Sequence, residues 1–224
     1  MAAILLLVVA SFMNWSGILH ADQWMPATEE AVFGRGELWR LWTTSWIHSD
    51  MGHLLSNSFL FFVLGYFLNG YFGWWVFPVT ALVFGGLTNA AVLGTYPPDV
   101  TLLGASGIVY WLGGAWLTLY FLLNRQKSLF QRALRSLGVA LVLFMPAEAF
   151  QPQISYRTHA AGFALGLLWG VLYFLWRKKE FRAAEVTEEI LEDDENVESV
   201  AAIPDSLREF VSDPSGRRSQ ARSE

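Results

Sequence analysis

Residues 102–110 read Leu-Leu-Gly-Ala-Ser-Gly-Ile-Val-Tyr, which places the hydroxyl of Ser106 between Gly104 and Gly107. Residues 106–123 form an apolar run that is long enough to cross most of a bilayer core. We therefore expect Ser106 to lie near one membrane surface, at the start of a membrane-spanning helix. A hydroxyl in that position needs a polar partner, because hydrocarbon offers none.

His159 is the candidate partner. It opens a second apolar run in which Gly162, Gly166 and Gly170 recur at helical spacing. An ionisable side chain inside a membrane span is costly and tends to mark a functional site. Small residues such as those around Ser106 are also common in spanning helices because they let backbones pack closely. The interpretation therefore depends on whether Ser106 and His159 come together.

The composition is that of a polytopic membrane protein. Of the 224 residues 54% are hydrophobic and only 16% are charged, and the charges are crowded into a few places. The formal net charge of −5 reflects an acidic tail after Lys179, and no basic patch suggests a nucleic-acid partner. The absence of cysteine excludes disulfides, thiolate metal ligands and a cysteine nucleophile.

The hydropathy pattern predicts an all-α integral membrane protein with a bundle of six transmembrane helices. No Lys or Arg precedes the first apolar run, so we interpret that run as a membrane span rather than a cleavable signal peptide. We expect a six-span membrane domain over residues 1–179 and an acidic, disordered cytoplasmic tail over residues 180–224. The predicted spans are 2–19, 54–71, 74–93, 106–123, 134–150 and 158–176.

Basic residues predict how the spans are oriented. They gather in the link between the fourth and fifth spans and again directly after the sixth span, so the positive-inside rule puts both segments in the cytoplasm. The N-terminus is then also cytoplasmic, and the connections 20–53, 94–103 and 151–157 face outward. We expect a bacterial plasma (inner) membrane with the site of interest near its outer face. The basic residues are Arg125, Lys127, Arg132, Arg135, Arg177, Lys178, Lys179 and Arg182.

This topology brings five polar residues to one depth. The second, fourth and sixth spans all run from outside to inside, and His53, Asn57, Ser106, Tyr110 and His159 each lie in the first turn or two of one of them. Polar residues scattered at random along the spans would rarely share a level in this way. We therefore expect these side chains to form one constellation near the outer face.

Helical spacing predicts which faces meet. Ser106, Tyr110 and Gly114 recur every four residues and share one face of the fourth span. The glycine face that begins at His159 carries almost no side-chain bulk, so the sixth span can approach the fourth closely. Close packing of these two faces would bring Ser106 within reach of His159.

The chemistry that fits this constellation is serine hydrolysis by a Ser-His dyad. His159 would take the proton of Ser106 as its oxygen attacks a carbonyl, and would return it to the leaving amine. His53, Asn57 and the backbone N–H of Ser106 would face the developing oxyanion. No aspartate accompanies the pair, so a dyad is favoured over a triad, with Tyr110 supporting the imidazole by stacking.

Three groups of motifs resemble those of the rhomboid intramembrane serine proteases. They are the Gly-Ala-Ser-Gly of residues 104–107 with Tyr110 behind it, the glycine-spaced run from His159, and His48 followed by His53 and Asn57. The pair Trp39-Arg40 also resembles the signature of the family's first outer loop. The resemblance covers residues 2–176, leaving the acidic tail outside it.

The resemblance implies a role for each motif position. Ser106 matches the family's nucleophile and His159 its general base, while His53 and Asn57 match the side-chain oxyanion donors. Tyr110 matches the residue that packs on the catalytic histidine. No motif position departs from the family pattern, which disfavours a catalytically inactive member.

The remaining implications concern the scaffold and its partners. His48 matches a histidine that braces the outer loop, and Gly104 belongs to the nucleophile motif in a supporting role. The family fold is a six-helix bundle with a water-filled cavity open to the outside. Its substrates are single-span membrane proteins cut in or near the span, in the lipid bilayer, without a cofactor or metal. The sequence sets no oligomeric state.

Three alternatives stay open at this point. His48, His53 and His159 could form a zinc ligand set, although no HExxH run or carboxylate cluster accompanies them. A non-catalytic rhomboid-like protein would bind transmembrane helices without cutting them, and would typically lack the serine or histidine retained here. A small transporter would be expected to show an internal repeat, and none is convincing.

Overall fold

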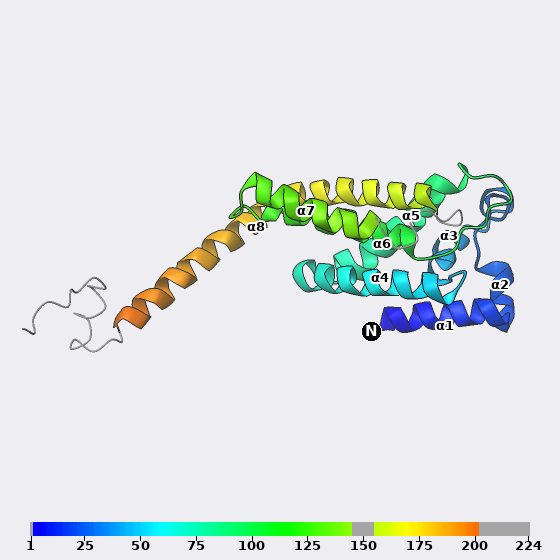
Figure 1. Ribbon diagram of the computed structural model, residues 1–224, viewed down its shortest axis with the longest axis horizontal. Coiled ribbons are helices and arrows are strands. Elements are labelled where there is room, and N and C mark those ends of the chain that lie inside the picture. Colours follow the sequence, from blue (N-terminus) through cyan, green and yellow to red (C-terminus); the bar gives the residue numbers. More distant parts are fainter. Residues whose placement is uncertain (1, 145–154, 202–224) are drawn as a thin grey trace, which may run out of the picture. The chain divides into compact units, whose positions relative to one another are not determined.

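The computed structural model describes residues 2–144 and 155–201, in which the regular structure is helical apart from one isolated bridge between Ala27 and Leu102 (Figure 1). The chain divides into two compact units, residues 1–176 and residues 177–224. In chain order the elements are α1 (Ala2–Ser16), η1 (Ile18–His20), α2 (Ala21–Trp24), η2 (Glu30–Gly34), α3 (Arg40–Thr43), η3 (Thr44–Trp46), α4 (Met51–Phe72), η4 (Trp75–Thr80), α5 (Ala81–Leu93), α6 (Ser106–Leu123), α7 (Leu129–Phe144) and α8 (Tyr156–Ala201).

The all-α prediction is confirmed for the described residues, but the count of six spans is not. In the part of the chain that the structure describes, four helical segments are long and apolar enough to cross a membrane: Met51–Phe72, Trp75–Leu93, Ser106–Leu123 and Tyr156–Ala184. A fifth is obtained only if α1 is joined to the helix that follows it across a bend of 108°.

The two remaining predicted spans differ in what the structure describes of them. The predicted first span ends early because Gly17 adopts a φ of +65° and turns the chain after α1, which has 15 residues and alone is shorter than the hydrocarbon core requires. The predicted fifth span overlaps α7, which has 16 residues, and the rest of that prediction up to residue 150 lies outside the described residues. The fifth span therefore stays a prediction.

The other predicted spans match the observed helices closely. The fourth coincides with α6, and the second and third start within three residues of α4 and η4. The helix that contains the sixth span begins at Tyr156 and continues past the predicted end to Ala201. Residues 202–224 lie outside the described residues, so the domain boundary at residue 179 and the disorder of the tail stay predictions.

α6 is the central helix of the first unit. It packs against α4, α5 and α7, and α1 in turn packs on α4 (Figure 1). About 67% of α6 is buried, against 33% for α4 and 44% for the segment that contains α5. Its buried positions run continuously from Ser106 to Ala115, so the N-terminal half of α6 is enclosed on every side.

α6 and α8 meet backbone to backbone along a seam of glycines. A Cβ atom added to Gly114 would lie 2.4 Å from the carbonyl oxygen of Phe163, and one added to Gly166 would lie 2.2 Å from that of Trp111. A Cβ on Gly162 would lie 2.5 Å from the carbonyl oxygen of Gly107. These separations leave no room for any side chain, so the predicted close packing of the two faces is confirmed.

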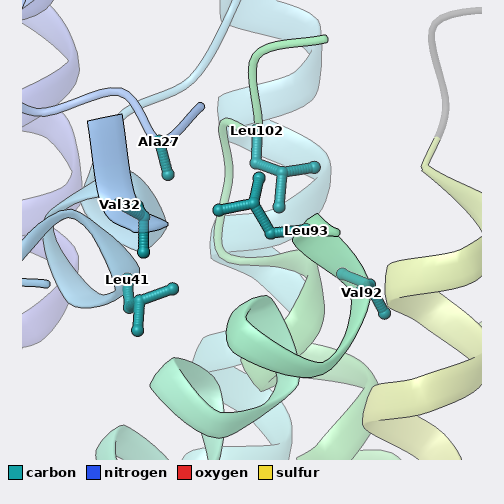
Figure 2. Close-up of a cluster of buried hydrophobic side chains, with 6 residues drawn as sticks. All are labelled: Ala27, Val32, Leu41, Val92, Leu93 and Leu102. Atoms are coloured by element: carbon teal, nitrogen blue, oxygen red, sulfur yellow. The ribbon is translucent and has the colours of Figure 1, made fainter. Parts of the chain in front are cut away.

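The long connection between α1 and α4 folds over the end of the bundle where α6 begins. Its segment 27–41 packs against the end of α5 and against Leu102, which precedes α6, in one hydrophobic cluster. Figure 2 shows the six buried members: Ala27, Val32, Leu41, Val92, Leu93 and Leu102. Arg40 is buried and donates to Pro26 O at 2.7 Å and to the Glu37 carboxylate. Leu38, Trp39 and Trp42 stay exposed, and tryptophan is enriched where a membrane protein meets the bilayer interface.

Candidate active site

Ser106 is the first residue of α6, and the two residues before it are held in place by their backbone N–H groups. Gly104 has a φ of +114°, a conformation that favours glycine, and its N–H donates to Thr44 O at 2.9 Å. The next N–H, that of Ala105, donates to His48 Nε2 at 3.3 Å. Ser106 therefore follows a sharply turned, hydrogen-bonded segment, residues 102–105, which we call the lead-in segment.

His48 links α1 to the lead-in segment by hydrogen bonds. The ring is fully buried, and burial lowers the pKa of His48 to about 3, so the imidazole is neutral. Because Nε2 accepts from Ala105 N–H, the ring proton sits on Nδ1 and is donated to Ser11 Oγ, 3.0 Å away. Trp15 adds a bond from its indole N–H to the His48 carbonyl at 2.7 Å.

His53 and Asn57, both on α4, lie close to the lead-in segment. A Cβ on Gly104 would lie 2.9 Å from His53 Nε2 and 3.8 Å from Asn57 Nδ2, so only a glycine lets the lead-in segment pass so near both groups. Asp50 caps α4 by accepting from His53 N–H at 2.9 Å, and Ser49 Oγ lies 3.1 Å from His53 Nδ1. Asp50 and Ser49 therefore hold the His53 ring with Nε2 toward Gly104.

His159 lies against the first turns of α6. Its ring stacks on that of Tyr110, with 4.0 Å between centroids and 12° between planes. Tyr110 is one turn beyond Ser106 on the same helix. In addition, a Cβ on Gly107 would touch the methyl group of Thr158 at 3.2 Å. The first turn of α8, which carries His159, is therefore in contact with the first turn of α6, which carries Ser106.

A cavity of about 480 Å³ opens at this meeting point. Ser106, His53 and Gly104 line it, together with side chains from the outer connection, from α5 and the loop behind it, and from the start of α8. Ser106 itself is only 7% exposed, so the cavity is its route to other molecules. The further lining residues are Thr44, Ser49, Asn89, Tyr96, Val100, Thr101, Leu102, Leu103, Ser155 and Thr158.

Several polar residues of this cavity were not predicted from the sequence. Asn89 on α5 is 3% exposed, and its amide donates to Leu41 O at 2.8 Å and to Ser45 Oγ at 3.1 Å. An asparagine inside an apolar run is a signal that could have drawn attention to it. Tyr96 and Ser155 lie in connections, where a polar residue is ordinary and gives no such signal.

The three histidines considered as a zinc set do not offer free donors together. Both ring nitrogens of His48 already have protein partners, Ala105 N–H and Ser11 Oγ. Within the described part of the chain, no group of three or more His, Asp or Glu side chains has the geometry to hold a metal ion.

Comparison with known proteins points to the family already suggested by the motifs. The family model described as "Rhomboid domain" matches residues 35–176. The Bacillus subtilis (strain 168) protein named "Putative rhomboid protease YdcA" is 30% identical over 150 residues, which are 66% of this chain and 72% of that protein. The Arabidopsis thaliana "RHOMBOID-like protein 5" is 27% identical over 155 residues, 67% of this chain and 49% of that protein, so the match spans about half of the plant relative.

The matched region contains every element of the site. It begins in the outer connection before Arg40, includes α4, α5 and α6 in full, and ends with the first unit at Trp176. The apolar helices and the family model agree on several passages through a bilayer. The chain therefore belongs to the rhomboid family and is a multi-pass integral membrane protein.

Proposed function

We propose that this protein is an intramembrane serine endopeptidase that hydrolyses peptide bonds in or near the transmembrane segments of other membrane proteins. Ser106 is the nucleophile, His159 is the general base, and no metal or cofactor takes part. The observation that carries the proposal is the contact between the first turns of α6 and α8: the ring of His159 stacks on Tyr110, one turn from a serine that lines a cavity. Family membership supports the same reading.

The reaction divides into acylation and deacylation. Ser106 Oγ attacks the scissile carbonyl carbon while its proton passes to the imidazole of His159, and the tetrahedral intermediate then expels the amine, which takes that proton. A water molecule repeats the sequence on the acyl-enzyme and releases the acid. Proton transfer of this kind contributes roughly a hundred- to ten-thousand-fold to the rate. The stacked Tyr110 ring restricts the tilt of the imidazole while the proton moves.

The negative charge that develops on the carbonyl oxygen meets donors from two helices. The N–H groups of Gly104 and Ala105 are already used by Thr44 and His48, so the next amide, that of Ser106 at the start of α6, is the backbone donor. The helix N-terminus adds a favourable partial positive charge. His53 and Asn57 supply side-chain donors, each worth on the order of 3 kcal/mol in a shielded site.

The substrates we propose are single-span membrane proteins that reach the cavity from the bilayer. The polar side chains that line part of the cavity suit a water-dependent hydrolysis, while most of the surrounding helical surface is apolar. The distribution of basic residues supports an orientation with the cavity toward the outer face of the membrane, which we propose to be a bacterial inner membrane. These assignments of substrate, membrane and orientation share one test, cleavage in a defined bilayer.

A serine-directed probe tests the nucleophile without knowledge of the natural substrate. The purified protein is treated with a fluorophosphonate, and the labelled peptide is located by mass spectrometry. We expect the label on Ser106, and we expect His159→Ala to abolish labelling while the thermal midpoint is retained. Labelling at another serine, or equal labelling of the His159→Ala variant, would contradict the dyad. No labelling of a folded protein would favour the alternative, a non-catalytic protein that binds transmembrane helices.

A further inference from the structure

The loop that follows α5 holds the residues that open α8. The hydroxyl of Tyr96 lies 2.5 Å from Ser155 Oγ, and Arg157 Nη1 donates to the carbonyl oxygen of Thr95. The guanidinium of Arg157 also lies over the Tyr96 ring, 5.1 Å from its centroid. Two adjacent loop residues thus make three contacts with a segment about sixty positions later in the chain.

The segment that they hold carries the candidate general base. The N–H of His159 donates to Ser155 O at 3.1 Å, so the backbone position of His159 follows that of Ser155. The side chain of Ser155 is bonded in addition to the hydroxyl of Thr158, the residue directly before His159. The contacts of Tyr96 and Arg157 therefore hold Ser155 and, through it, Thr158, the residues that fix the backbone position of His159.

Tyr96 is itself anchored near the nucleophile. Its ring packs against the hydrophobic cluster of Figure 2, and so does Ala161, which lies two residues beyond His159 on α8. The cluster includes Leu102, which lies four residues before Ser106 and pairs its backbone with that of Ala27. One buried cluster thus connects the lead-in segment before Ser106, the loop with Tyr96 and the helix with His159.

The contacts described for His159 in the site do not replace this anchoring. Stacking on Tyr110 restricts tilt of the imidazole, but two parallel rings can slide past each other at small cost. The first turn of any helix also lacks the complete set of backbone bonds and frays most readily. A position error of about 1 Å in a catalytic group can lower the rate roughly a hundred-fold.

We propose that Tyr96 and Arg157 are positioning residues, which fix the first turn of α8 so that the imidazole of His159 is held at Ser106. The proposal rests on the proposed function, because it assigns a task to that same dyad. Tyr96 lines the cavity, whereas Arg157 lies outside the set of residues that line it, so the Arg157 variants separate positioning from direct contact with substrate.

Two substitutions remove the anchoring with little change of shape. Tyr96→Phe deletes one hydroxyl and keeps the ring for the cluster and for Arg157, and Arg157→Met deletes the charge and the donor but keeps the chain length. We expect each to lower kcat about three- to tenfold on a labelled single-span substrate in liposomes, with KM unchanged. The double variant should lose less than the product of the two effects, because both act on one turn.

Conservative and matched variants separate positioning from general damage. Arg157→Lys keeps a cation that can donate to Thr95 O, so it should retain most of the kcat that Arg157→Met loses. Tyr71→Phe removes a hydroxyl from a tyrosine that is 75% exposed on α4 and should change nothing. The rate at which a fluorophosphonate labels Ser106 gives a readout that needs the dyad but no substrate, and it should fall in parallel with kcat.

The result that supports the proposal is a parallel loss of kcat and labelling rate in Tyr96→Phe and Arg157→Met, at an unchanged thermal midpoint, with recovery in Arg157→Lys. Unchanged rates in both variants would overturn it. So would a loss in Arg157→Lys equal to that in Arg157→Met, or a rate loss accompanied by a lower midpoint and a higher KM. If the unmodified protein is not labelled at Ser106, the proposed function fails and this inference falls with it; normal labelling of Tyr96→Phe and Arg157→Met refutes only the inference.

Discussion

α6 and the lead-in segment before it are held by different kinds of contact. Toward α8 the helix meets backbone with backbone, at Gly114, Gly162 and Gly166, and no side chain lies between these backbones. The lead-in segment is held by polar groups instead, Thr44 O and the ring of His48. The glycine seam therefore fixes how closely α6 and α8 approach, whereas the two hydrogen bonds fix the orientation of the chain that enters α6.

The largest effect should come from filling the seam. Gly166→Ala puts a methyl group 2.2 Å from Trp111 O, and because the obstacle is backbone, the two helices must separate. We expect a loss of about 3 kcal/mol in the free energy of unfolding, near the upper end for overpacking, and loss of cleavage. The measurement is thermal unfolding in detergent, followed by activity at a temperature where the variant is folded.

Gly70→Ala is the matched control for that experiment. A Cβ on Gly70, inside α4, meets no atom within 4 Å. Alanine favours a helix over glycine by about 0.5–1 kcal/mol, so this variant should be slightly more stable than the parent protein. If Gly166→Ala proved as stable as Gly70→Ala, the seam would not set the separation of α6 and α8.

The next largest effect should come from a substitution in the lead-in segment before α6. Gly104→Ala adds backbone strain at φ +114° and places a methyl group 2.7 Å from the ring of His53. We expect a fall of at least tenfold in kcat, with a smaller loss of stability than for Gly166→Ala, since a side chain can shift where a backbone cannot. Gly36→Ala introduces a side chain at a φ of +74° with open space around it, so it isolates the strain of a positive φ, about 1 kcal/mol, from the displacement of His53.

A smaller effect should follow from removing the His48 ring. His48→Ala removes the partner of the buried N–H of Ala105 and leaves Ser11 Oγ with Trp46 O alone, which costs about 1–3 kcal/mol. Ser11→Ala should cost less, because it keeps the bond to Ala105 and removes only the bonds of Ser11 Oγ to His48 Nδ1 and Trp46 O. Unfolding midpoints of the two variants test this order, and equal midpoints would mean that the bond to Ala105 contributes nothing.

The smallest effect lies at the cap of α4. The bond from His53 N–H holds the pKa of Asp50 below its ordinary value of 3.8. A lowered folded pKa means that the stabilisation is complete above the ordinary value and is lost as the pH falls through the folded one. Asp50→Ala should therefore be less stable by about 1 kcal/mol at neutral pH, with the difference shrinking in strong acid. A constant difference across that range would contradict the cap.

Local pattern was enough to predict the centre of the molecule. The bounds of α6 and the glycine seam followed from apolar length and four-residue spacing, because both are properties of single helices and of residue size. The pattern placed His53 and Asn57 at the depth of Ser106, and both side chains lie near Gly104, two residues before that serine. These are the parts in which the bilayer leaves few alternatives.

The parts that were not predicted depend on contacts between distant connections. The chain bends by 108° after α1, at Gly17, and one glycine in an apolar run is not enough to predict such a bend. The partners of Asn89 are a carbonyl and a hydroxyl more than forty residues away, and the contacts of Tyr96 and Arg157 reach further still. Hydrogen bonds of this kind have no periodicity, so no pattern in the sequence reveals them.

The most direct test of the Ser106–His159 dyad is cleavage of a labelled single-span protein, reconstituted in liposomes with either the unmodified protein or Ser106→Ala. The two preparations must share the same thermal midpoint, so that any difference lies in chemistry rather than folding. We expect the unmodified protein to cut the substrate in or near its span and Ser106→Ala to leave it intact. Cleavage at equal rates by both preparations would contradict the assignment of Ser106 as the nucleophile.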